Sequence, residues 1–320
     1  MDIQVILMQM VQLFLVIGLG YFLFKVKILD VELNKRLTTL LLAVTTPALI
    51  ISSVLSTTEY LPFTDILFVF LVGILVYIVL PILGWILVKI MRIPLPQQGL
   101  YIFMTVFSNI GFMGFPVMKA IFGNDAVIEK FDKDVFDAVF YTALFNMLFN
   151  LLVFSVGTGI MGYGTGRKMN FNPKDLLSPG VIASLVALVI YMAKIQFPNV
   201  ISSTITMIGD ITTPIAMLII GSTLANIPLK EVFSELRIYP YTFIKQVIIP
   251  ALAYPVLRLF IQDPLILGVT LIMISMPVAN SAVLFATEYD GDVSLAAKAV
   301  FMTTLLSIVT IPLIVSLFLA

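Results

Sequence analysis

The chain has 320 residues, of which 60% are hydrophobic and 11% are charged, and its 18 basic residues balance its 18 acidic ones. Soluble proteins average roughly 45–50% apolar and about 25% charged residues, so this composition indicates a membrane protein surrounded by a lipid bilayer. The absence of Cys and His removes disulfides, thiolates and the usual zinc ligands, so we expect no metal site, no cofactor and no enzymatic activity. No basic patch suggests nucleic acid as a partner.

Ten apolar segments are long enough to cross the membrane as helices, which takes about 20 residues for ~30 Å of hydrocarbon. Their continuous apolar character excludes a β-barrel, whose strands alternate. We therefore expect an all-α membrane protein with ten transmembrane helices. The predicted spans are 3–24, 36–56, 63–91, 97–122, 135–161, 176–194, 201–226, 237–261, 265–289 and 294–319.

Basic residues concentrate in alternate connections between these spans. The connections after the first, third, fifth and seventh spans contain Lys25, Arg92, Arg167 and Arg237, among others. The positive-inside rule places these connections in the cytoplasm, so both termini are expected outside the plasma membrane. The connection at 288–292 is acidic although the same scheme places it inside.

Two motifs occur twice, displaced by about half the chain. Thr-Thr-Pro at 45–47 recurs at 212–214, and Ala-Val-Phe-x-Thr-x-Leu at 138–144 recurs at 299–305. A duplicated domain explains these pairs. Five spans per copy is an odd number, so the second copy must enter the membrane from the opposite side. Inverted repeats of this kind are typical of secondary transporters that work by alternating access.

The predicted domains follow from this duplication. The first five-helix repeat covers 1–161, a short cytoplasmic linker covers 162–175, and the second, inverted repeat covers 176–320.

The fourth and ninth spans carry helix-breaking residues at similar depths. These residues are Asn109, Gly111, Gly114 and Pro116 in the fourth span and Pro277, Asn280 and Ser281 in the ninth. Proline removes an amide hydrogen and glycine permits non-helical dihedrals, so both helices should break. Broken helices are tolerated at this depth where they are buried or line a wet cavity, and their N-termini attract anions. The seven residues are our predicted substrate-binding site; a proline kink packed by small residues is the alternative.

Further polar residues lie within or beside spans. Asp210, near the middle of the seventh span, is the predicted ion-coupling residue, because a carboxylate there costs ~2.5–3.5 kcal/mol to insert. The alternative is a carboxylate satisfied by nearby Thr hydroxyls or closer to the interface. Lys298 either contacts an anion or extends toward the headgroups. Asn146 and Asn150 share a helix face and either line the cavity, with Asn146 as an eighth substrate residue, or bridge helices.

Several stretches together resemble the auxin efflux carrier family, which includes bacterial malate permeases and plant auxin exporters. They are Asn109-x-Gly111-x-x-Gly114-x-Pro116, residues 178–183, residues 213–224 and the break at Pro277 and Asn280. The resemblance covers essentially the whole chain. It implies the fold of sodium/proton antiporters and bile-acid symporters, in which helices 1, 2, 6 and 7 form a scaffold. Helices 3–5 and 8–10 would then form a transport domain whose helices 4 and 9 cross at their breaks, beside the substrate.

The function we expect is secondary active transport of small organic anions, such as mono- or dicarboxylates, by alternating access. Two alternatives stay open. One is a sodium- or proton-coupled symporter or antiporter of another solute, with Asp210 as the titrating group, and the other is a membrane receptor that senses its ligand. A homodimer, if formed, is expected to use the scaffold helices.

Overall fold

The computed structural model describes residues 3–55, 63–122, 135–153, 155–163, 178–226, 233, 235–289 and 291–319. Within these ranges the only extended pairing is one isolated antiparallel bridge, and the regular structure is otherwise helical. The predicted all-α class is therefore confirmed. Most of the predicted linker at 162–175 lies outside the described residues.

The helices follow one another along the chain with short connections. In the first half they are α1 (Ile3–Lys25), α2 (Val31–Leu40), η1 (Leu41–Thr45), α3 (Thr46–Leu55), α4 (Phe63–Ile90), α5 (Leu95–Val106), η2 (Ile110–Gly114), α6 (Phe115–Phe122), α8 (Val135–Val153) and α9 (Val156–Gly162), where η marks a π-helical segment. In the second half they are α10 (Pro179–Met192), α11 (Asn199–Asp210), α12 (Thr212–Ala225), α14 (Ile238–Phe243), η4 (Ile244–Ile248), α15 (Ile249–Phe260), α16 (Pro264–Ser275), α17 (Ser281–Glu288) and α18 (Val293–Phe318).

Five stretches of the described chain are long and apolar enough to cross a membrane. They are Val31–Leu55, Phe63–Ile90, Asn199–Ala225, Ile238–Phe260 and Val293–Phe318, and the bent pair α8 and α9 makes a sixth if it is one span. Shorter apolar helices account for the other predicted spans. The chain is thus a helical protein with several apolar spans, and the ten-helix inverted repeat stays a prediction.

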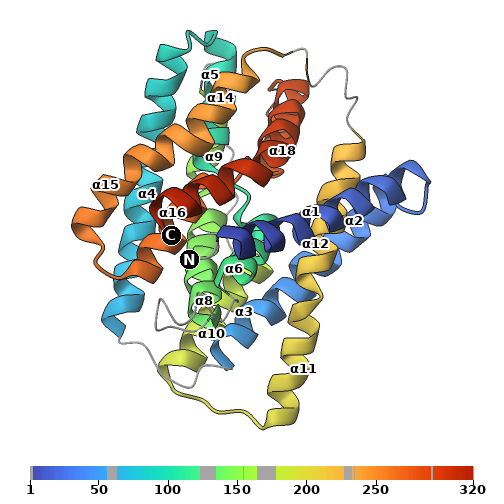
Figure 1. Ribbon diagram of the computed structural model, residues 1–320, viewed down its shortest axis with the longest axis vertical. Helices are drawn as coiled ribbons and strands as arrows, with labels where there is room; N and C mark the ends of the chain where they lie inside the picture. The colour runs from blue at the N-terminus through green and yellow to red at the C-terminus, as the bar shows by residue number, and fades with distance from the viewer. Residues whose placement is uncertain are drawn as a thin grey trace.

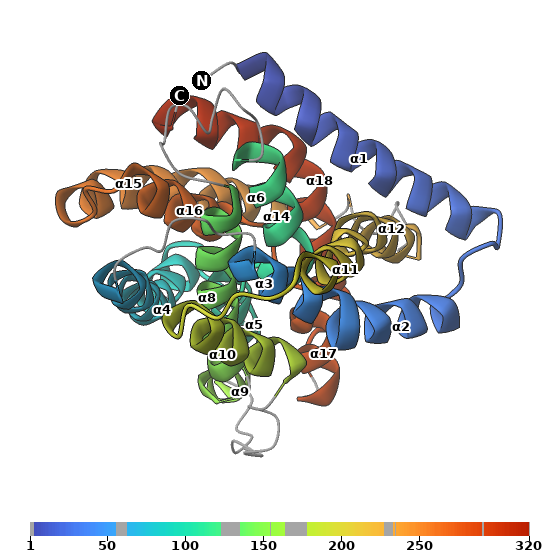
Figure 2. The ribbon, with the colours of Figure 1, turned by 90° about the horizontal axis from the view of Figure 1, so that it is seen from below.

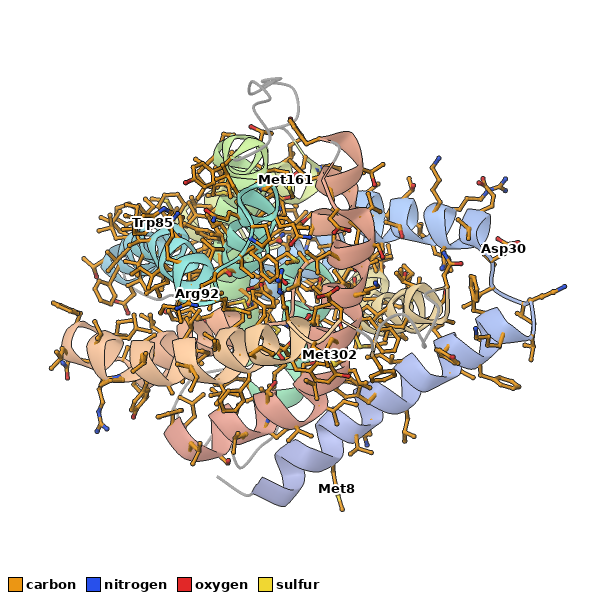
Figure 3. All side chains as sticks on the ribbon, turned by 90° about the horizontal axis from the view of Figure 1, so that it is seen from above. Met8, Asp30, Trp85, Arg92, Met161 and Met302 are labelled. Atoms are coloured by element: carbon orange, nitrogen blue, oxygen red, sulfur yellow. The ribbon has the colours of Figure 1, made fainter. Side chains whose placement is uncertain are left out.

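The helices form a bundle around the crossing of the broken segments. Figures 1 and 2 show α11 and α12 along one side, α4 and α15 along the other, and α8 between them. The start of α1 lies beside the end of α18. Apolar side chains cover the outside as well as the core: Met8 projects from α1 with 68% of its surface exposed, whereas Met302 lies among the helices (Figure 3). Such a surface is what lipid requires.

Each π-helical segment precedes a proline. Pro47 follows η1, Pro116 follows η2 and Pro250 follows η4, each two residues after the segment ends. A proline donates no amide hydrogen to the turn before it, and the wider i→i+5 turn changes the hydrogen-bond register there. Pro116 therefore lies in the first turn of α6. The fourth span breaks earlier than Pro116, at 107–109.

A very close helix contact joins α1 to α12 through two glycines. A Cβ on Gly221 would overlap the carbonyl oxygen of Ile17, and one on Gly20 would overlap that of Leu218. Small residues allow two helix backbones to approach this closely in a membrane, where van der Waals contact is the main attraction between helices. The helices α1 and α12 are therefore closely packed, and α12 lies on one side of the site described next.

Candidate functional site

The two broken segments cross and satisfy each other's backbone groups. Ser108 and Val278 form the antiparallel bridge, in which the Asn109 amide donates to the Pro277 carbonyl at 2.8 Å. The Ala279 amide donates to the Phe107 carbonyl at 3.1 Å. Two bonds thus replace helical hydrogen bonds that the breaks remove, so this non-helical backbone is compatible with the interior of the membrane.

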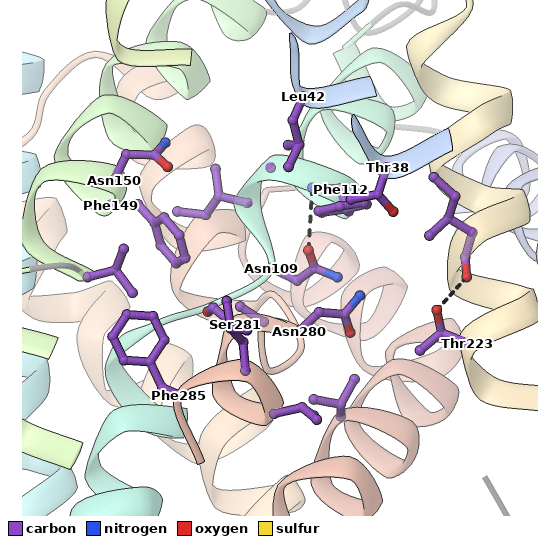
Figure 4. A pocket seen from close by; sticks show the side chains of 18 of the residues that line it. Thr38, Leu42, Asn109, Phe112, Phe149, Asn150, Thr223, Asn280, Ser281 and Phe285 are labelled. Carbon is purple, nitrogen blue, oxygen red and sulfur yellow. Dashed lines mark hydrogen bonds between the residues drawn. The ribbon is translucent and has the colours of Figure 1, made fainter. Parts of the chain in front are cut away.

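A cavity of about 760 Å³ extends from this crossing between the helices. Its lining includes both segments that begin at the breaks, from Asn109 to Phe112 and from Ala279 to Ser281. Figure 4 shows Asn109 and Asn280 next to each other, with their amide groups directed toward the same open space. Across that space lie Thr38 of α2 and Thr223 of α12.

Amide side chains dominate the polar part of this lining. Six asparagines contribute to it: Asn34, Asn109, Asn146, Asn150, Asn226 and Asn280. The Asn109 Oδ1 accepts from the Phe112 amide at 3.4 Å and so caps η2, which leaves the Nδ2 of Asn109 directed to the cavity. Asn146 lies between Gly111 and Gly180, where a Cβ would come within 3.5 and 3.6 Å of its amide group. The Ser281 hydroxyl is buried and has no hydrogen-bond partner among the described residues.

The lining is cationic rather than anionic. Lys35 of α2 is its one charged residue within the described ranges, and no Asp or Glu side chain there contributes to it. The N-terminal ends of η2 and α17 also contribute to the lining, and helix N-termini carry a partial positive charge. An anion is therefore better matched to this cavity than a cation.

Residues behind the lining hold the crossing in place. The buried Lys245 ammonium of η4 donates to the Met276 carbonyl at 2.5 Å and to the Ser108 Oγ at 3.0 Å. The Val278 amide donates to the Thr303 Oγ1 at 3.1 Å, and the Gln246 Nε2 donates to the Thr303 carbonyl at 2.9 Å. The helices η4 and α18 thus bind the crossing through side chains that do not line the cavity.

The structure brings five of the predicted substrate residues together on the lining: Asn109, Gly111, Asn146, Asn280 and Ser281. The other three are elsewhere. Pro277 is part of the bridge through its carbonyl, and Gly114 and Pro116 are buried in η2 and α6, beyond the crossing.

The two predicted charged residues do not line the cavity. Asp210 is 59% exposed, at the end of α11, and its Oδ1 accepts from the Lys119 Nζ of α6 at 2.7 Å. Lys298 is half-buried in α18 between two lining residues, Ala297 and Val300. No ion pair joins Lys298 to another described residue.

Several lining residues were not predicted from the sequence. Lys35 and Thr38 lie on α2 and Thr223 lies on α12, all on the wall opposite the crossing. The sequence pattern indicated no role for them, because each is an ordinary polar residue near the end of a span. The stretch at 178–180, which carried part of the family resemblance, also lines the cavity, and Ser178 caps α10 by accepting from the Val181 amide.

Comparison with known proteins agrees with this architecture. A family model described as "Membrane transport protein" matches residues 5–174 and 167–315, which is almost the whole chain. The chain belongs to the auxin efflux carrier family. The resemblance seen in the broken segments is thereby confirmed, and the chain is a membrane transport protein.

Relatives within the auxin efflux carrier family are distant. An uncharacterized transporter of Methanocaldococcus jannaschii is 28% identical over 303 residues, which cover 92% of each chain. The PIN-LIKES 1 protein of Arabidopsis thaliana is 25% identical over 67% of this chain and 56% of its own. A Rhizobium meliloti protein, whose name proposes malonate as its substrate, is 23% identical over 65% of this chain and 63% of its own.

Proposed function

We propose that the chain is a secondary active carrier of small organic anions, such as mono- or dicarboxylates, in the plasma membrane. The observation that carries this proposal is the cavity that ends at the crossing of two broken helices, lined by six amide side chains and one lysine. Among its described lining residues there is no carboxylate that would repel an anion or bind a cation.

The contacts suggest how a carboxylate would bind. The Nδ2 groups of Asn109 and Asn280 would donate to its oxygens, next to the N-terminal ends of η2 and α17. Lys35, on the opposite wall, would attract a second carboxylate or steer the first one. A malonate-sized dianion fits a cavity of about 760 Å³ with room for water. The name of the Rhizobium meliloti relative makes malonate a reasonable first probe.

The Lys119–Asp210 ion pair lies outside the cavity lining. The lining includes the start of α2 and the ends of α12 and α17, close to the connections that we expect in the cytoplasm. Lys119 lies near the end of α6, next to a connection that we expect outside. In our proposal the cavity is open to the cytoplasm, and this pair joins the transport helix α6 to the scaffold helix α11 on the closed side. Alternating access then requires the pair to separate.

Asp210 also supports a second candidate, coupling to protons or sodium. Protonation of its carboxylate, or replacement of Lys119 by a cation, would release the ion pair and link an ion gradient to the conformational change. This role differs from a coupling site inside the substrate cavity. A homodimer through the scaffold helices also remains a proposal.

Purified protein tests the carrier proposal directly. Thermal-shift screening of carboxylates, with and without sodium at two pH values, should reveal a ligand, and proteoliposomes should show its counterflow. Asn109→Ala and Asn280→Ala should each weaken binding about 10- to 100-fold, because a hydrogen bond to a charged group contributes about 1.5–3 kcal/mol. Asn199→Ala, on the exposed start of α11 and outside the lining, is the matched control.

Two results would contradict the proposal. One is that no carboxylate binds or exchanges. The other is that both cavity variants bind the carboxylate as well as the control does. Binding without counterflow would instead favour a receptor.

A further inference from the structure

Lys245 is a buried cation at the centre of the bundle. Only 1% of its surface is exposed, and it lies in the π-helical segment η4. Its Nζ donates to the Met276 carbonyl, the last carbonyl before the break in the ninth span, and to the Ser108 hydroxyl, beside the break in the fourth. One ammonium group therefore contacts both broken segments.

No opposite charge accompanies this ammonium in the part of the chain that the structure describes. The two ion pairs found there join Arg36 to Glu32 and Lys119 to Asp210, and no described carboxylate oxygen lies within 4.0 Å of the Lys245 Nζ. Its stabilisation comes instead from dipoles, because Met276 caps the C-terminus of α16, the negative end of that helix. The Lys245 amino group is thus held by a carbonyl and a hydroxyl group, with no described carboxylate beside it.

The substrate cavity begins on the other side of Ser108. Ser108 lines the cavity and accepts from Lys245, whereas Lys245 itself does not line it. One hydroxyl group separates the ammonium from the space where an anion would bind. A buried charge is screened much less than an exposed one, so its field extends into the cavity.

We infer that Lys245 is a specificity-determining residue. It makes the end of the cavity at the crossing selective for anions without touching the substrate. It acts through Ser108 and the crossing, as a positioning residue with a fixed charge. This inference rests on the proposed function for its biological meaning. The field itself can be tested without any substrate.

The chain contains no native cysteine, so single introduced cysteines report on the cavity cleanly. Asn280→Cys places a thiol on the lining next to the crossing, at a partly exposed position, which we call the inner thiol. Thr287→Cys places one on the lining at an exposed position of α17, the outer thiol. Each is modified with the anionic sulfonatoethyl and the cationic trimethylammonioethyl methanethiosulfonate. A Lys35→Met background removes the charge of the lining lysine. The measured quantity is the ratio of the anionic to the cationic reaction rate.

With Lys245 present, the ratio at the inner thiol should exceed that at the outer thiol. Lys245→Met and Lys245→Gln should lower the anionic-to-cationic rate ratio at the inner thiol about tenfold or more. A unit charge ~10 Å away changes the rate of the anionic reagent and that of the cationic reagent several-fold in opposite directions. Lys245→Arg should restore the ratio. Lys89→Met is the control, because Lys89 is exposed on α4, outside the cavity lining.

Four outcomes would overturn the inference. They are equal ratios at the inner and outer thiols in the presence of Lys245, an unchanged ratio in both neutral variants, an equal drop with Lys89→Met, and an inner thiol that neither reagent modifies. The first and last comparisons need no Lys245 variant, so they decide the question even if the neutral variants fail to fold. A protein that binds no carboxylate but shows the expected ratios would refute the proposed function and leave this inference standing.

Discussion

Thr142 and Thr303 occupy the same position of the duplicated Ala-Val-Phe-x-Thr-x-Leu motif, yet they make different contacts. The Thr142 Oγ1 donates to the Ala138 carbonyl of its own helix at 2.7 Å. The Thr303 Oγ1 makes the equivalent bond and also accepts from the Val278 amide at 3.1 Å. Valine has nearly the shape of threonine and a similar helix propensity, so Thr→Val at the two positions isolates this one extra hydrogen bond.

The expected costs differ because only one variant leaves a buried donor unpaired. Val278 has no exposed surface, so in Thr303→Val its amide loses its partner without gaining water, which costs about 1–3 kcal/mol. In Thr142→Val the Ala138 carbonyl keeps its helical amide donor, and the cost should be about 0.5 kcal/mol or less. In a chain of this size about 1 kcal/mol corresponds to ~2–4 °C in Tm.

The assay is the apparent Tm of purified protein in detergent, measured as the fraction that elutes as a single species after heating. Thr303→Val should lower it by about 3–8 °C and Thr142→Val by about 2 °C or less. Thr303→Val should also weaken carboxylate binding, because it loosens the backbone from which Asn280 projects. Equal losses of Tm in the two variants would refute the argument that the Thr303 hydroxyl supports the crossing.

Three more predictions concern packing, charge and gating. Gly221→Ala should lower the apparent Tm by several degrees, because overpacking costs about 1–3 kcal/mol. Gly18→Ala should leave the Tm unchanged, because no atom lies within 4 Å of the added Cβ. Equal Tm values in the two variants would contradict the close contact of α1 and α12. Asn109→Asp keeps an oxygen to cap η2 but adds a negative charge to the cavity, so anion binding in a thermal-shift assay should fall about 100-fold or more with little change in Tm. Asp210→Asn and Lys119→Gln should each raise the labelling rate of a cysteine introduced beside the pair, by about two- to fivefold for a partly exposed ion pair. The charge-swapped double variant, Asp210→Lys with Lys119→Asp, should restore the original rate. A double variant whose rate is the sum of the two single effects would show that the ion pair does not hold the closed side together.

The sequence predicted the two helix breaks because their chemical signals are local, whereas the crossing of the broken helices was implied by the family resemblance. Glycine, proline and asparagine inside an apolar span can be found without knowing what packs against them, and Asn109, Asn280 and Ser281 do lie on one cavity. Pro116 shows the limit of this reasoning. The break lies at 107–109, whereas Pro116 follows a π-helical turn and lies in the first turn of α6.

The remaining site residues could not be predicted because their roles depend on partners from other helices. Lys35 is one of several basic residues near a membrane surface, and only the fold brings it opposite the crossing. Asp210 suggested a buried ion site, but Lys119, far away in sequence, pairs with it. Lys245 is an isolated lysine in an apolar span, and its two acceptors come from segments on either side of it in the chain.

Lys245 and Asp210 lie in the second half of the chain, and neither has a charged counterpart in the first half. Pro81 pairs with Pro250 in the duplication, which places Lys245 opposite Val76, and Asp210 falls opposite Ala43. In a symmetric inverted repeat, exchanging the conformations of the two copies converts the inward-open state into the outward-open state. The two states would therefore have similar energies. The Lys119–Asp210 pair has no equivalent that could form in the exchanged state, because Ala43 carries no charge. In the proposed carrier, the state that contains this ion pair should therefore be the more stable one, and a bound anion would have to supply the difference in free energy for turnover.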